Sequence, residues 1–150
     1  MSTLNTPLVE PELFKTFAFW GSILAIKLLA MAPLTARYRF KNKVFSNIED
    51  TKGLKGAKVN TNDPEVERVR RAHLNDLENI LIWYIVTFAW LTTGPSAWLA
   101  TNLIRSFVLA RVGHTISYAI LSVQPHRAIA FFVGFLITVY QAISTVLYYY

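Results

Sequence analysis

Residues 67–79 read ERVRRAHLNDLEN and run, without a glycine or proline, into the apolar segment Ile80–Val86. Asp63 and Pro64 precede the stretch and have the side chains of a helix N-cap and a first helical residue. The pattern predicts one helix, charged at one end and apolar at the other. Ionisable groups in or beside a membrane usually face a bundle interior or a water-filled cavity, because lipid exposure is costly. We therefore interpret the stretch as one wall of a polar site that opens to water at the membrane face.

The composition indicates an integral membrane protein. Hydrophobic residues make up 53% of the 150 residues and charged residues only 16%, against about 25% in soluble proteins. The formal net charge of +6 comes from basic residues beside apolar runs, which fits membrane topology and anionic ligands better than nucleic acid. The chain has no cysteine, which excludes disulfides, a cysteine metal site and a protein thiol nucleophile. The three histidines fall on different segments, so we expect no metal site.

The hydropathy pattern predicts an all-α, single-domain protein with four membrane spans, at about 13–36, 64–91, 97–121 and 128–150. Pro33 is expected to kink or end the first helix near its far end. Lys27 lies within that span and either pairs inside the bundle or extends to the interface. Uncharged or proline-containing turns at 92–96 and 122–127 separate the later spans.

The distribution of charge between segments predicts the orientation. The loop at 37–63 is the most basic of the chain, which places it in the cytosol by the positive-inside rule. Residues 1–12 carry two acidic side chains and no early basic cluster, so we expect no cleaved signal peptide there. Four spans would leave both termini on the lumenal side.

Two predicted helices each carry a polar stripe. Arg71, Asn75 and Glu78 share one face at i, i+4 and i+7. On the third predicted helix Arg111 and Tyr118 follow a similar spacing, with His114 between them.

These residue types suit an anionic ligand that also carries an ammonium group. The planar fork of arginine donates two parallel hydrogen bonds to a carboxylate. Asn75 and Glu78 are suited to receive an ammonium group, and Tyr118 and Arg127 to donate to an anion. The alternative interpretation of both stripes is a solvated face or a structural ion network.

The motifs resemble those of the MAPEG family of membrane proteins. The longest is VERVRRAHLNDLEN at residues 66–79. Shorter similarities are Tyr38-Arg39, Val44–Asn47, Ala110-Arg111, His114–Ile116, Gln124–Ala128 and Phe131–Gly134, so the resemblance extends over essentially the whole chain.

The resemblance implies a four-helix subunit of a homotrimer in the endoplasmic reticulum membrane, and the sequence leaves open a further location in the mitochondrial outer membrane. It implies a transferase that joins glutathione, its co-substrate, to hydrophobic electrophiles. Reduction of lipid hydroperoxides needs the same glutathione thiolate, so we consider it as a side activity. Glutathione would bind between subunits near the cytosolic face, at positions that carry over to Arg39, Arg70, Arg71, His73, Glu78 and Tyr118, with Asn75, Arg111 and Arg127 as further members of the site. Either Arg127 or Arg111 is expected to face the sulfur and to act in catalysis.

Two other functions remain open on the same scaffold. One is a prostaglandin- or leukotriene-synthase-like enzyme, and the other is a non-enzymatic membrane scaffold that binds lipid or a partner protein. The resemblance is incomplete at Asn47–Thr51, where vertebrate relatives carry a cysteine whose modification raises activity. Thiol-triggered activation therefore does not carry over to this chain.

Overall fold

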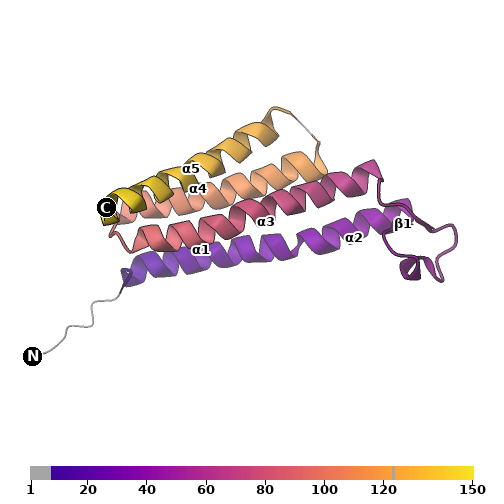
Figure 1. Ribbon diagram of the computed structural model, residues 1–150, viewed down its shortest axis with the longest axis horizontal. Helices are drawn as coiled ribbons and strands as arrows, with labels where there is room; N and C mark the ends of the chain where they lie inside the picture. The colour runs from indigo at the N-terminus through magenta and orange to yellow at the C-terminus, as the bar shows by residue number, and fades with distance from the viewer. Residues whose placement is uncertain (1–7, 123) are drawn as a thin grey trace, which may run out of the picture.

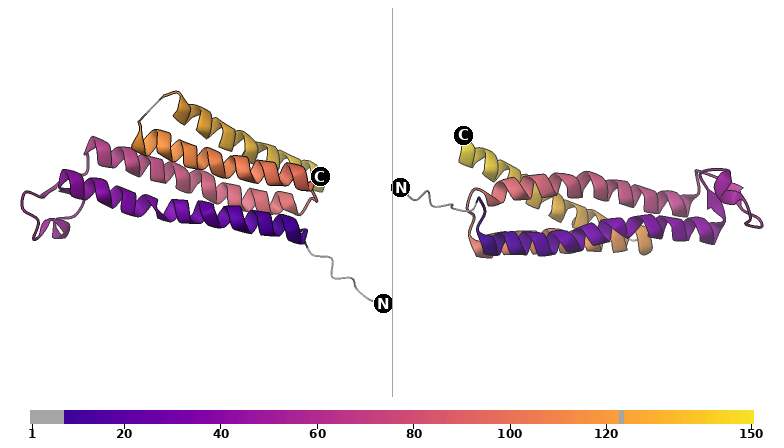
Figure 2. Two further views of the ribbon diagram at one scale, coloured as in Figure 1. Left: turned by 180° about the vertical axis from the view of Figure 1, so that it is seen from behind. Right: turned by 90° about the horizontal axis from the view of Figure 1, so that it is seen from below.

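Four long helical rods lie side by side in the computed structural model, which describes residues 8–122 and 124–150 (Figures 1 and 2). The first rod consists of α1 (Pro11–Leu29) and α2 (Met31–Asn42), and the others are α3 (Pro64–Leu91), α4 (Ala97–Thr115) and α5 (His126–Tyr149). A 3₁₀ turn, η1 (Glu49–Thr51), and a parallel pair of two-residue strands, β1 (Val44–Phe45) and β2 (Lys58–Val59), lie in the loop between α2 and α3. The prediction of an all-α fold is confirmed. Most of the segment 1–12, and residue 123 in the predicted turn at 122–127, lie outside the described residues.

The first rod is longer than the sequence predicts. Pro33 has no N–H to donate to the Leu29 carbonyl four residues earlier, and the break between α1 and α2 falls there, at Ala30. The helix does not end near residue 36, because α2 continues to Asn42. Arg39 and its basic neighbours therefore lie on a helix, and the loop begins at Lys43. The helix therefore continues through the basic residues and does not end where the apolar residues end.

The start of α3 forms as predicted. The Asp63 carboxylate accepts from the backbone N–H groups of Glu65 and Val66, each at 3.1 Å, and Pro64 is the first helical residue. These bonds satisfy donors that a helix N-terminus otherwise leaves unpaired. The Asn42 amide donates to Asp63 and Glu65, each at 3.0 Å, and so joins the end of α2 to the start of α3.

The core is centred on aromatic packing between α3 and α4. Trp83 and Phe107 stack with ring centroids 4.5 Å apart and planes within 3°, and both are buried. Deeper in the bundle, the Thr87 hydroxyl donates to the buried Gln141 side chain at 2.8 Å. α4 and α5 pack closely, α1 contacts both α3 and α4, and α3 contacts α5.

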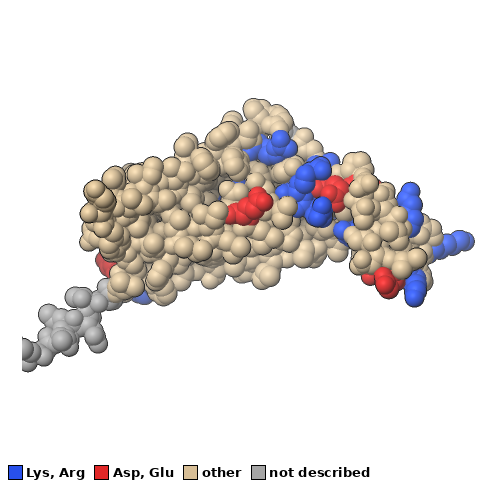
Figure 3. All heavy atoms as spheres, in the orientation of Figure 1, with Lys and Arg blue, Asp and Glu red and all other residues tan. Residues whose placement is uncertain are grey.

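The outer surface is apolar over much of its length. Ile85, Leu109 and Leu136 are exposed by 60% or more, as expected of side chains that face lipid. Two segments of the described chain, Pro11–Asn42 and His126–Tyr149, are long and apolar enough to cross a membrane by length and composition. α3 and α4 are not among them, and charged residues interrupt both helices. Figure 3 shows the charges gathered toward the end of the molecule that carries the 43–63 loop.

Candidate functional site

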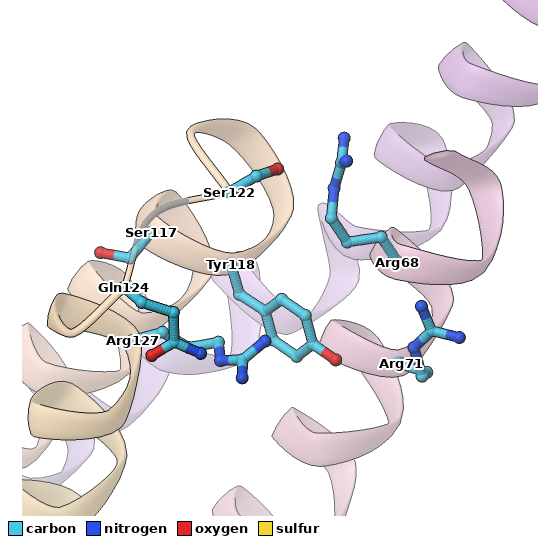
Figure 4. A pocket seen from close by; sticks show the side chains of 7 residues that line it. All are labelled: Arg68, Arg71, Ser117, Tyr118, Ser122, Gln124 and Arg127. Carbon is cyan, nitrogen blue, oxygen red and sulfur yellow. The ribbon is translucent and has the colours of Figure 1, made fainter. Parts of the chain in front are cut away.

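A pocket of about 260 Å³ lies between the charged half of α3 and the junction of α4 and α5. Its lining is polar and basic, and it consists of Arg68, Arg71, Ser117, Tyr118, Ser122, Gln124 and Arg127 (Figure 4). Three guanidinium groups and no carboxylate line this space, so it favours an anion.

A π-helical turn presents Tyr118 to the pocket. α4 passes at Thr115 into the turn Ile116–Ile120, η2, which closes with a 2.9 Å bond from the Leu121 N–H to the Ile116 carbonyl. Figure 4 shows the Tyr118 hydroxyl directed toward α3. Such turns are rare and occur often at functional sites.

Arg127 is held over Tyr118 at the start of α5. Its guanidinium carbon lies 4.4 Å from the centre of the Tyr118 ring, a cation–π distance. The Gln124 amide, with its oxygen toward the guanidinium, accepts from Arg127 Nε at 3.2 Å. The guanidinium is partly exposed, so it keeps donors for a ligand.

A second pocket of about 290 Å³ adjoins the first. Its lining includes Asn75, His114, Phe131 and Phe132, and it shares Tyr118 and Arg127 with the first pocket. The shared residues make one cleft with a basic end and an aromatic wall. Such a cleft can hold a charged molecule and bring an apolar one beside it.

Behind the cleft lies a buried ion cluster centred on Asp76. Its carboxylate is fully buried and one oxygen accepts from Arg111 Nη2 at 2.5 Å. The other oxygen pairs with the Lys27 ammonium group and accepts from the Thr115 hydroxyl at 3.1 Å. Lys27 therefore pairs inside the bundle and does not extend to the interface.

The sequence analysis missed Asp76 as a site residue. A signal was present, because Lys27 is a charge within an apolar span that needs a partner of opposite sign, and Asp76 is an acidic residue of the charged stretch 67–79. It also missed Arg68, Ser117, Ser122 and Gln124, which line the first pocket.

The structure brings together only some of the predicted site residues. Arg71, Tyr118 and Arg127 line one pocket, and Asn75 joins the last two in the other. Arg111 is 1% exposed and lies behind the cleft, so its role beside the sulfur stays a prediction.

The remaining predicted residues lie outside both pockets. Arg70 is exposed and donates from Nε to Glu67 at 2.8 Å. Glu78 is exposed, His73 is half-buried on another face of α3, and Arg39 lies on α2. One chain therefore assembles part of the predicted site.

The chemistry available in the cleft is electrostatic and hydrogen bonding. Within residues 8–122 and 124–150, no three histidine or acidic side chains converge as a metal site would require. The arginines and the tyrosine hydroxyl can hold and stabilise an anion, including one that forms on a ligand.

The sequence is similar to those of several known proteins. A sequence model described as the MAPEG family matches residues 17–147. The chain is 42% identical over 141 residues to a microsomal glutathione S-transferase 1 from Homo sapiens, with 91% of each chain covered. It is 43% identical over 139 residues to the protein of the same name from Bos taurus, with 90% of each covered. A prostaglandin E synthase from Bos taurus is 32% identical over 124 residues, covering 83% of this chain and 81% of the relative.

Proposed function

Because the chain belongs to the MAPEG family, we propose that it is a membrane-bound glutathione transferase. The observation that carries the proposal is the cleft in which Arg71, Tyr118 and Arg127 meet. Glutathione has two carboxylates, one ammonium group and one thiol, so an excess of cationic donors matches its charge. Relatives more than 40% identical over nine-tenths of the chain are named glutathione S-transferases.

The proposed role of the cleft is to ionise the thiol. An ordinary thiol has a pKa of about 8.5, so little thiolate is present at neutral pH. A nearby guanidinium favours the thiolate and lowers that pKa. We assign this role to Arg127, because it is partly exposed within the cleft, whereas Arg111 already donates hydrogen bonds to Asp76 and Asn75.

The transfer itself needs no covalent enzyme intermediate. The thiol proton leaves to water and the sulfur lone pair forms a bond to the electrophilic carbon. The leaving group departs with the electron pair of the broken bond. The protein holds the tripeptide and stabilises the thiolate, and the aromatic wall at Phe131 and Phe132 accommodates an apolar partner.

The same thiolate supports hydroperoxide reduction. It attacks the terminal peroxide oxygen and releases an alcohol. A second glutathione then converts the resulting sulfenic acid to glutathione disulfide and water. Two glutathione molecules and one lipid hydroperoxide are consumed in each cycle.

We further propose a four-span topology in the endoplasmic reticulum membrane with the 43–63 loop in the cytosol. α3 has 28 residues and is about 42 Å long at 1.5 Å per residue. The hydrocarbon core is about 30 Å thick, so the charged start of α3 can extend beyond it into water. The pairing of Asp76 with Lys27 and Arg111 removes much of the cost of charge within the bundle.

The proposed assembly is a homotrimer with glutathione between subunits. Four predicted site residues lie outside the cleft of a single chain: Arg39, Arg70, His73 and Glu78. In a trimer, these residues of one subunit would contact glutathione bound in the cleft of its neighbour.

Prostaglandin synthesis is the second candidate, favoured by the 32% identity to a prostaglandin E synthase. Turnover of a generic aryl halide by purified protein distinguishes the two. Rapid glutathione-dependent turnover supports the transferase, and turnover confined to a prostaglandin endoperoxide supports the synthase. Absence of heat on mixing with glutathione in calorimetry would favour a non-enzymatic scaffold.

A further inference from the structure

The buried ion cluster behind the cleft has a second consequence, which rests on the proposed function. We propose that Asp76 and Arg111 are positioning residues that hold the Asn75 side-chain amide as a hydrogen-bond donor facing glutathione. They act through Asn75 and touch no reacting atom.

The guanidinium of Arg111 is fixed from one side by Asp76. Nη2 donates to Asp76 Oδ1 at 2.5 Å and Nε donates to the same oxygen at 3.2 Å. Asp76 is itself held, because its second oxygen is engaged by Lys27 and Thr115. Arg111 and Asp76 are at most 1% exposed, so water cannot readily replace these partners.

The fixed guanidinium determines the orientation of Asn75. Arg111 Nη2 donates to Asn75 Oδ1 at 2.8 Å. A guanidinium has donors only, so the amide oxygen, and not the amide nitrogen, must face it. The Asn75 side chain lines the second pocket beside Tyr118 and Arg127.

The ligand group that meets Asn75 follows from this orientation. With its oxygen occupied, the amide offers N–H donors, which suit a carboxylate or a peptide carbonyl of glutathione. The sequence analysis expected Asn75 to receive an ammonium group, but that group would have to share the amide oxygen with the cationic Arg111 guanidinium, which repels it. Asn75 therefore adds to the anion-binding side of the site.

A double-mutant cycle on purified, glutathione-binding protein tests this coupling. Asn75→Ala, Arg111→Met and the combined variant are compared with the wild type for glutathione affinity by calorimetry and for KM and kcat with an aryl halide. Arg105→Met is the matched control, because Arg105 is an exposed arginine of the same helix that lies over Trp20 and outside the cluster.

We expect Asn75→Ala and Arg111→Met each to weaken glutathione binding about tenfold, the loss typical of a hydrogen bond to a charged group. In the Asn75→Ala background, Arg111→Met should weaken glutathione binding by less than about a further twofold, because the side chain that Arg111 positions is already absent. The effect should appear in KM for glutathione, with kcat nearly unchanged, and Arg105→Met should match the wild type.

Equal losses from Arg111→Met in both backgrounds would overturn the proposal, since a merely structural role is additive. If Arg111→Met does not fold, Thr115→Val replaces it in the cycle, because it removes only one hydrogen bond to Asp76. A Thr115→Val effect that vanishes without Asn75 supports the proposal, and one that persists contradicts it. A wild-type protein that binds no glutathione would instead refute the proposed function.

Discussion

Arg127 and Tyr118 form the contact on which the proposed chemistry of the cleft depends. The guanidinium carbon lies 4.4 Å from the centre of the ring, and the Gln124 amide oxygen, turned toward the guanidinium, accepts from its Nε. This cation–π contact holds the charge in place without neutralising it, in contrast to an ion pair with a carboxylate. The positive charge remains available to a thiolate.

Arg127→Ala should raise the pKa of the bound glutathione thiol by about one pH unit, because the stabilising charge is lost. The rate at neutral pH should fall about tenfold and the pH–rate profile should move to higher pH. Arg127→Lys keeps the charge and should retain part of the shift. Arg105→Ala, on the outer face, is the control. An unchanged profile for Arg127→Ala would remove Arg127 from the mechanism.

Arg71→Ala and Glu78→Ala should each weaken glutathione binding about tenfold, as expected for loss of a charged hydrogen-bond partner. Arg71 lines the cleft of the single chain, whereas Glu78 does not. Calorimetry therefore separates two cases. Weaker binding in both variants fits a site completed by a second copy, and weaker binding in Arg71→Ala alone fits a site within one chain.

Helical spacing predicts one stripe of Arg71, Asn75 and Glu78, and of these Glu78 lies outside both pockets of the single chain. Arg71 and Asn75 share a face of α3, and both line the cleft. The partnership of Asp76 with Lys27 and Arg111 was not predictable, because it depends on how α1, α3 and α4 pack. The π turn around Tyr118 was also unpredictable, since one extra residue in a helical turn leaves no hydropathy signature.

Among the elements, α3 connects the apolar bundle to the charged cleft. Its N-terminal cap fixes where the helix begins, and the Asn42 bridge ties α2 to that point. The hydrogen bond from the Val66 backbone N–H is the main cause that lowers the pKa of Asp63 below its ordinary value of 3.8. The cap therefore depends on the charge state of this carboxylate.

Asp63→Ala should lower the free energy of unfolding by about 1 kcal/mol at neutral pH, as is typical for loss of an N-cap. Because the folded pKa is lowered, the stabilisation is present above the unfolded pKa and is lost as the pH falls through the folded pKa. The difference from the wild type should therefore shrink below about pH 3.8. The Asp63→Asn side chain caps the helix without titrating. The difference in free energy of unfolding between Asp63→Asn and Asp63→Ala should therefore not shrink at low pH. Denaturant unfolding in detergent at several pH values provides the comparison.

The bounds of α3 followed from Asp63, Pro64 and the turn after Leu91, all of which are local signals. The extension of α2 to Asn42 did not follow, because hydropathy reports where apolar residues stop and not where the helix stops. Pro33 predicted that the first helix would be interrupted. The interruption falls at Ala30, three residues before Pro33, because Pro33 cannot donate a hydrogen bond to the Leu29 carbonyl.

The whole molecule combines an apolar outer surface with a charged end (Figure 3). By the positive-inside rule, that asymmetry predicts that the basic loop lies on the cytosolic side of a membrane. The absence of cysteine makes the orientation simple to measure by labelling.

Single cysteines introduced as Thr51→Cys and Glu10→Cys should differ in reactivity toward a membrane-impermeant maleimide in sealed microsomes. The proposed topology predicts that Thr51→Cys is labelled at once and Glu10→Cys only after detergent is added. The wild type supplies the unlabelled background. The reverse pattern would invert the topology, and labelling of both in intact vesicles would exclude a lumenal N-terminal side.

The central claim is that arginine side chains at one end of a membrane helix bundle hold glutathione with its sulfur ionised. Its most direct test is the ultraviolet absorbance of thiolate when glutathione is titrated into purified protein in detergent at neutral pH. We predict a saturable thiolate signal that is much weaker in Arg127→Ala. Saturable binding with no thiolate absorbance, or an equal signal in Arg127→Ala, would contradict the account.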